Sequence, residues 1–199
     1  PIAASFLALS NQQKAAGVVL ANIGSQTTSI AVFEEGIPVS LSILPIGSLD
    51  ITNDIALGLR VPLDEAERIK IGSENVVTLK KKLDEIIEAR LSDMFELIEG
   101  HLKKIGRSGL LPAGLVLSGG GAALPNLDRL AKEELKLPAR VLTPVIDAAG
   151  KTQIKDPAWL VAYGLCLFGL GAELGESVGT RLFRRTKGKF LQWLRELLP

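Results

Sequence analysis

A small-residue turn near the start of the chain, Ile23–Thr28, carries residue types that can bind a phosphate. Apolar runs flank this turn, Val18–Leu20 before it and Ile30–Phe33 after it. The pattern therefore predicts a strand–turn–strand hairpin over Gly17–Gly36. Glycine, serine and threonine between two buried strands can direct backbone N–H groups and hydroxyls at one point, as a bound phosphate requires. The same residue types also serve turn geometry alone, so both interpretations stay open at this hairpin.

A second glycine-rich turn, Gly119–Ala122, lies in the second half of the chain. It follows the apolar run Gly114–Ser118, which predicts a buried strand, and precedes a helical pattern over Asn126–Leu135. This order places free N–H groups where a ligand can approach closely. No Gly-Lys-Ser/Thr follows the glycines, and their spacing differs from the dinucleotide-binding fingerprint. A ligand role and a purely structural role both remain open for this turn.

Histidine and cysteine contribute little chemistry, because the chain has one of each, His101 and Cys166. They cannot complete a metal site or form an intramolecular disulfide. We expect His101 to face solvent or cap a helix, and Cys166 to be inert in the core. No catalytic residue and no metal ligand is predicted.

The charge of the chain is unevenly distributed. The net charge is +1, but from Arg181 onward there are six basic residues and one acidic residue. This asymmetry predicts a basic arm for an anionic surface. The arm lacks the interleaved aromatic residues of a single-strand nucleic-acid platform, so no nucleic-acid partner is predicted.

The last ten residues before the C-terminus, Lys189–Leu198, have an amphipathic helical pattern. An aromatic residue and basic flanks are typical of a helix that lies in a membrane interface. A helix docked on the body of the protein or on a partner is the alternative. The apolar arc of this tail helix consists of Phe190, Leu191, Trp193, Leu194, Leu197 and Leu198.

The remaining elements are predicted from hydrophobic period. A polar break falls at Asn11–Lys14, and Asp156–Gly169 is almost uncharged and too short to span a membrane, which predicts a fully buried helix. We also expect the end of a helix at Ile2–Leu9, a third strand at Pro38–Leu44, helices at Leu49–Leu59, Pro62–Ile71 and Val76–Ile105, and a short strand at Arg140–Leu142.

Five stretches taken together resemble the FtsA family of bacterial cell-division proteins, within the actin and heat-shock-chaperone ATPase superfamily. They are NIGSQTTSIAVFEEG, LPIGSLDITNDIALGLRVPLDEAERIKI, LDEIIEARLSDMFELI, LVLSGGGAALPNLDRLA and GKFLQWLRELL. The resemblance implies an α/β fold: an actin-like (ribonuclease H-like) ATPase subdomain with a small helical insert and a C-terminal amphipathic helix. It covers the second half of the family's fold, without the first phosphate loop.

The resemblance also implies an organisation into parts. The large subdomain would comprise residues 1–50 and 110–172, and the inserted smaller subdomain residues 51–109. A linker of residues 173–188 would lead to the membrane-targeting helix of residues 189–199.

Site residues are implied in the same way. Gly24, Ser25, Thr27 and Thr28 would belong to the second phosphate loop, with the two threonines contacting phosphates. Glu67 and Lys70, three apart on one helix face, would reach the ribose and adenine of ATP. The adenosine loop would consist of Gly119, Gly120, Gly121 and Ala122.

This sequence departs from the family pattern at the phosphate loop and in the insert. Asn22 and Ser29 stand where the family has aspartates, and Ser25 and Gln26 stand where it has glycines. An amide cannot neutralise Mg²⁺ or act as a base, so we expect ATP binding with impaired Mg²⁺ binding and little or no hydrolysis. Only Gly72–Asn75 remains of a strand-forming stretch in the insert, which predicts an altered surface for FtsZ.

The resemblance implies a cell-division adaptor at the cytoplasmic face of the cell membrane, at the division site. It would polymerise as an actin-like protein, bind the tubulin-like protein FtsZ through its insert, and contact membrane lipids through its tail. Two alternatives are an active actin-like ATPase that needs a first half encoded elsewhere, and a pilus-assembly-type actin-like adaptor. The missing acid at Asn22 argues against the first, and the TNDIALGLR stretch and the tail argue against the second.

Overall fold

The computed structural model describes residues 1–73, 79–142 and 157–169. Within these residues, one sheet of five strands has the order β3-β2-β1-β4-β5. The strands are β1 (Val18–Ile23), β2 (Thr28–Glu34), β3 (Ile37–Leu44), β4 (Leu115–Ser118) and β5 (Ala139–Val141). The first three strands pair antiparallel, whereas β4 lies parallel to β1 and β5 parallel to β4. The predicted hairpin, the third strand and the strand before the glycine-rich turn are confirmed.

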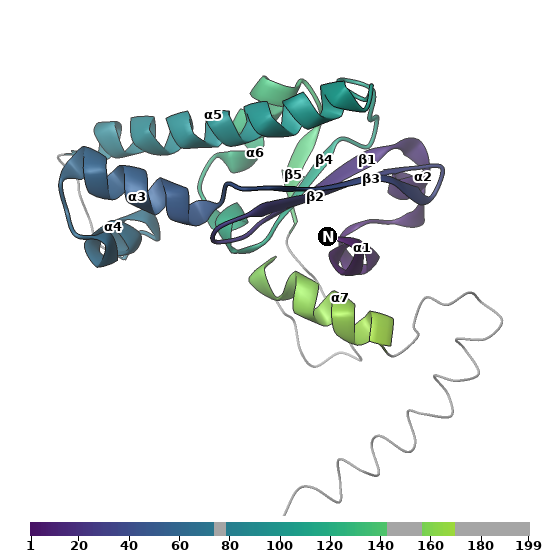
Figure 1. Ribbon diagram of the computed structural model, residues 1–199, viewed down its shortest axis with the longest axis horizontal. Coiled ribbons are helices and arrows are strands. Elements are labelled where there is room, and N and C mark those ends of the chain that lie inside the picture. Colours follow the sequence, from purple (N-terminus) through teal and green to yellow (C-terminus); the bar gives the residue numbers. More distant parts are fainter. Residues whose placement is uncertain (74–78, 143–156, 170–199) are drawn as a thin grey trace, which may run out of the picture.

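Helices cover both faces of the sheet (Figure 1). On one face lies α5 (Lys80–Lys104), whose Met94, Phe95 and Ile98 are fully buried. On the other lie α1 (Ile2–Ala8) and α7 (Leu160–Gly169). Because β1 is buried between these two layers, its run Val18–Ile23 is apolar almost throughout rather than alternating.

The segment between β3 and β4 extends beyond the sheet on one side (Figure 1). It contains α3 (Ser48–Leu59), α4 (Leu63–Lys70) and α5, and the first half of α5 projects beyond the sheet beside α3 and α4 (Figure 1). Arg90 of α5 donates to both carboxylate oxygens of Asp54 on α3, at 2.5 and 2.9 Å, which fixes the two helices against each other. The helical character of this segment agrees with the predicted insert, while the boundaries at residues 51 and 109 stay a prediction.

Two elements differ from the sequence prediction in their bounds or type. The polar break at Asn11–Lys14 is part of a short helix, α2 (Asn11–Ala16). A reciprocal cap starts it: Ser10 accepts from the Gln13 N–H, and the Gln13 side chain accepts from the Ser10 N–H. After β4 the chain forms a 3₁₀ turn, η2 (Gly120–Ala123), and only then α6 (Leu127–Leu135).

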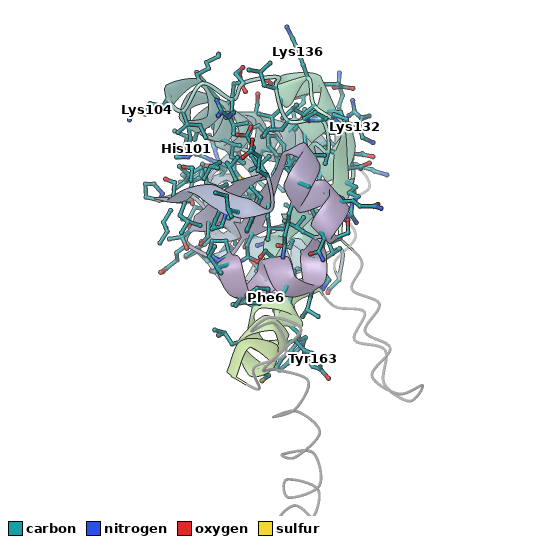
Figure 2. The ribbon with its side chains drawn as sticks, turned by 90° about the vertical axis from the view of Figure 1, so that its right-hand side faces the viewer. Phe6, His101, Lys104, Lys132, Lys136 and Tyr163 are labelled. Carbon is teal, nitrogen blue, oxygen red and sulfur yellow. The ribbon has the colours of Figure 1, made fainter. Side chains whose placement is uncertain are left out.

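The prediction of a fully buried helix at Asp156–Gly169 is wrong. The described part is a 3₁₀ turn, η3 (Pro157–Trp159), followed by α7. Trp159 and Leu165 are 59% and 57% exposed, and Cys166 is exposed rather than buried in the core. Among the described residues, α1 is the helix that covers one side of α7. Tyr163 of α7 and Phe6 of α1 lie in this region in Figure 2. No helix among the described residues is long and apolar enough to cross a membrane.

The edge strand β3 places its apolar side chains outward. Leu41 and Ile43 are 55% and 68% exposed, whereas Ser40 lies beneath α5. The Ser40 hydroxyl lies 2.9 Å from Nε2 of His101, which therefore bridges α5 and the sheet instead of capping a helix (Figure 2). Burial and the nearby charge of Lys104 lower the pKa of His101, so its ring is neutral at pH 7.

The predicted linker, residues 173–188, and the predicted tail helix, residues 189–199, lie outside the described residues.

Candidate functional site

The turn between β1 and β2 is anchored to the start of α3. Within the turn, the Gly24 N–H donates to the Thr27 carbonyl at 2.9 Å. From α3, the Ser48 N–H donates to the Gly24 carbonyl at 2.9 Å and the Leu49 N–H to the Ser25 carbonyl at 2.7 Å. These hydrogen bonds from α3 fix the backbone of the turn, while Ser25, Gln26 and Thr27 are exposed to solvent. An exposed and fixed turn of this kind can receive a phosphate.

Thr28 does not occupy the position that the phosphate prediction required. Its side chain is fully buried, and its hydroxyl donates to the Ile46 carbonyl at 2.8 Å. Strand alternation is the reason: Thr28 is the first residue of β2 and points into the core beside Met94 of α5. Gly24, Ser25 and Thr27 lie in the turn itself, where their phosphate role stays a prediction.

In the glycine-rich turn, Gly119 and Gly121 pack against β1, whereas Gly120 is exposed to solvent. A Cβ on Gly119 would overlap the Ile23 carbonyl oxygen, and one on Gly121 would overlap the Ile23 side chain. These two glycines therefore allow η2 to lie directly against the end of β1. Ala122 is 2% exposed. Gly120, in contrast, is exposed, and a Cβ there would meet the Ala158 side chain only at an ordinary van der Waals distance of 3.9 Å.

Glu67 and Lys70 form an ion pair on α4, with 2.7 Å between Lys70 Nζ and Glu67 Oε2. The Lys70 side chain is only 7% exposed, whereas that of Glu67 is 46% exposed. Burial raises the pKa of Glu67, but hydrogen bonds from Lys70 and Thr52 and the Lys70 charge outweigh it, so the pKa lies below its usual value. Glu67 is therefore an ionised acceptor at the surface, suited to sugar hydroxyls, and Lys70 lies behind it.

A pocket of about 630 Å³ connects these parts. It brings together five of the predicted site residues: Ser25, Glu67, Lys70, Gly120 and Gly121. The other predicted residues, Gly24, Thr27, Thr28, Gly119 and Ala122, do not line it. The volume lies within the usual range for small-molecule sites. Several further residues line the pocket without having been predicted from the sequence: Ser48, Ile69, Ile71, Gly72, Lys80, Leu83, Asp84, Ile87, Ala123, Leu124 and Pro125.

The missed residues give the pocket its apolar wall. Leu83 and Ile87 come from the start of α5, and Leu124 and Pro125 follow η2. Apolar side chains of this kind are surroundings that a planar base favours, since it can be buried among them. The sequence could have indicated Ser48, because it immediately precedes the predicted helix Leu49–Leu59 and begins α3. It gave no signal for the α5 residues, because their place in the pocket depends on how α5 packs against η2 and α6.

The residues around the turn between β1 and β2 (Ile23–Thr28, named the phosphate turn for its predicted role) do not fit a metal ion. The Asn22 side chain accepts from the Ser118 hydroxyl at 3.3 Å, which supplies a neutral oxygen and no carboxylate. Among the residues that the structure describes, no three His, Cys, Asp or Glu side chains gather closely enough to hold a metal ion. The described residues around this turn therefore supply no carboxylate cluster for Mg²⁺.

The sequence was compared with known protein families. The model of the family described as "Cell division protein FtsA" matches residues 19–164. FtsA of Bacillus subtilis is 34% identical over 190 residues, covering 84% of this chain and 42% of that protein. FtsA of Pseudomonas aeruginosa is 30% identical over 191 residues, covering 85% of this chain and 46% of that protein. The chain thus spans less than half the length of these relatives.

The fold was compared with solved structures. A PilM–PilN type IV pilus biogenesis complex matches with a TM-score of 0.69 and 22% identity, over 85% of this chain and 51% of that chain. MreB5 of Spiroplasma citri bound to ADP matches with a TM-score of 0.66 and 18% identity, over 83% of this chain and 57% of that chain. At these identities the matches show the fold alone, and they confirm the predicted actin-like α/β class.

Proposed function

Because the chain belongs to the FtsA family of cell division proteins, we propose that it is an actin-like adaptor that binds ATP in the pocket between α4, α5 and η2. The observation that carries this proposal is the shape and chemistry of that pocket. A polar end at Ser25 and Ser48 adjoins the exposed turn, and Glu67 lies along one side. The apolar wall provides room for a base. Phosphates, ribose and adenine would thus each contact residues suited to them.

In this proposal ATP serves assembly more than catalysis. Neither Asn22 nor Ser29 can act as a general base or neutralise a metal ion, so nothing in the described turn promotes attack of water on a phosphate. The nucleotide would stabilise the arrangement of the turn, α3 and α4 that a neighbouring subunit recognises. The chain is therefore proposed as a nucleotide-binding scaffold that polymerises.

The remaining parts of the proposal concern partners. The insert around α3, α4 and α5 would bind FtsZ, and the basic, amphipathic tail would contact lipids at the cytoplasmic face of the membrane, at the division site. A single short amphipathic helix binds a membrane weakly and reversibly. Assembly into a polymer would present many such helices together and so multiply the attachment.

Replacing Glu67 tests the nucleotide site. We expect Glu67→Gln to weaken ADP binding roughly tenfold, because a neutral amide loses the charge-assisted hydrogen bonds to the ribose hydroxyls. Isothermal titration calorimetry with ADP and with 2′,3′-dideoxy-ADP, which lacks both ribose hydroxyls, measures the change in affinity. The analogue without hydroxyls should bind the parent and the variant equally.

Glu65→Gln is the matched control, since Glu65 lies on the same helix but does not line the pocket. It should bind ADP as the parent does. Equal ADP affinity of the parent and Glu67→Gln would contradict the placement of the ribose.

A further inference from the structure

Lys70 is enclosed by acceptors rather than directed into the pocket. Its ammonium group donates to the Ser48 carbonyl at 3.1 Å and to Thr52 Oγ1 at 2.8 Å, both on α3, and contacts Glu67 Oε2 at 2.7 Å. An ammonium group has three protons, and three acceptors surround it here. With a side chain only 7% exposed, Lys70 has no donor left for a ligand unless one of these contacts breaks.

The Ser48 carbonyl that Lys70 binds belongs to the residue that anchors the phosphate turn. The Ser48 N–H donates to Gly24 at 2.9 Å, and the next N–H, that of Leu49, donates to Ser25 at 2.7 Å. A continuous path of hydrogen bonds therefore runs from Glu67 through Lys70 and Ser48 to Gly24.

Thr52 of α3 contacts both members of the Glu67–Lys70 ion pair. Its hydroxyl accepts from Lys70 and donates to Glu67 Oε2 at 2.6 Å, and the residue is 2% exposed. Glu67 thus keeps one partner on α3 even where Lys70 is lost. Thr52 Oγ1 also lies 3.3 Å from the Ser48 carbonyl, but its single proton is directed to Glu67 at the shorter distance. Removal of the Lys70 charge therefore removes the stronger side-chain link between Glu67 and Ser48 without releasing Glu67 itself.

We infer that Lys70 is a positioning residue that couples the ribose end of the pocket to the phosphate turn through the backbone of Ser48. This inference rests on the proposed nucleotide site. A ribose bound to Glu67 would hold Lys70 in place and thereby fix the turn for the phosphates. Thermodynamic linkage makes this coupling reciprocal: the factor by which bound ribose raises phosphate affinity equals the factor by which bound phosphate raises ribose affinity.

Hydrogen exchange tests the coupling without any ligand. In Lys70→Met, which keeps a long side chain but no donor, we expect the Ser48 and Leu49 amides to exchange roughly tenfold faster, the factor that corresponds to one charge-assisted hydrogen bond. The matched control is Lys82→Met. Lys82 also donates to a backbone carbonyl of α3, that of Gly58 at 2.6 Å, but at the other end of the helix. The control should leave Ser48 and Leu49 unchanged.

The amides of β4 are the internal reference for global stability. Faster exchange at Ser48 and Leu49 with unchanged Leu115–Leu117 supports the coupling. Unchanged exchange at Ser48 and Leu49 overturns it. Equal acceleration in all five amides also overturns it, because Lys70 would then act on the whole fold rather than on the turn.

Ligand affinities supply the second readout. Lys70→Met should weaken ADP binding about tenfold but adenosine binding less than threefold, since adenosine does not use the phosphate turn. An equal loss for both ligands would make Lys70 a direct ribose contact and overturn its positioning role. If the parent binds neither ADP nor adenosine, the proposed function fails. Hydrogen exchange then still decides whether Lys70 holds the turn.

Discussion

Substitution Gly119→Ala is expected to destabilise the fold by on the order of 3 kcal/mol. Gly119 has φ 90° and ψ 170°, a conformation that is almost restricted to glycine. An added Cβ would in addition overlap the Ile23 carbonyl and approach Oδ1 of Asn22 to 2.7 Å. Because these are atoms at the end of a central strand, they cannot move aside cheaply. Urea unfolding followed by circular dichroism measures the loss.

The neighbouring glycine provides the matched control. At Gly120 the nearest atom to an added Cβ is the Ala158 Cβ, at 3.9 Å, which is an ordinary contact. Gly120→Ala should therefore change the free energy of unfolding by less than about 0.5 kcal/mol. Equal destabilisation by the two substitutions would contradict the description of η2 as a turn held against β1 by Gly119.

Substitution Trp193→Glu is expected to remove the chain from liposomes. Trp193 lies in the apolar arc predicted for Lys189–Leu198, and aromatic side chains of this kind lie at the membrane interface. A carboxylate there replaces a favourable contact by a charge that must stay in water and that anionic lipids repel. Flotation with vesicles containing anionic lipid should show membrane affinity reduced by more than about tenfold.

Gln192→Glu adds the same charge on the polar side of the predicted helix. It should weaken membrane binding only through repulsion between the new carboxylate and the anionic lipids, about fivefold for one charge at low salt. A Trp193→Glu variant that floats as well as the parent would refute the membrane role of the tail.

Much of the fold could be predicted from local pattern. The hairpin over Gly17–Gly36 was predictable because small turn residues separate two apolar runs that are long enough for strands. Strand β4, its glycine turn and α6 followed from the same logic. Helix α5 was predictable from its apolar period, although its described part begins at Lys80 rather than at Val76.

The failures have tertiary causes. The alternation of apolar and polar residues identified β3 as a strand, but it did not show which face of the strand would be covered. In the structure Leu41 is exposed, whereas Ser40 contacts α5. The nearly uncharged sequence of α7 indicated burial on all sides, yet Leu165 is exposed because only one side meets α1. For a helix of this kind, composition alone cannot tell how many sides have a neighbour.

In the candidate site, too, local pattern predicted some features, whereas others depend on tertiary packing. A spacing of three placed Glu67 and Lys70 on one face of α4, as predicted. It could not tell that Ser48 and Thr52 would enclose Lys70 and leave Glu67 at the surface, because those partners come from α3. Likewise, the alternation that turns Thr28 into the core depends on where β2 begins.

The most direct test of the central claim is a titration of the isotope-labelled chain with ATP, followed through backbone amide chemical shifts. We expect saturable shifts at Ser25, Ser48, Gly120 and Gly121, which line the pocket from three separate segments, and none at the exposed edge strand Ile37–Leu44. Shifts that are absent at millimolar ATP, or that occur without these four residues, would contradict a nucleotide site between α4, α5 and η2.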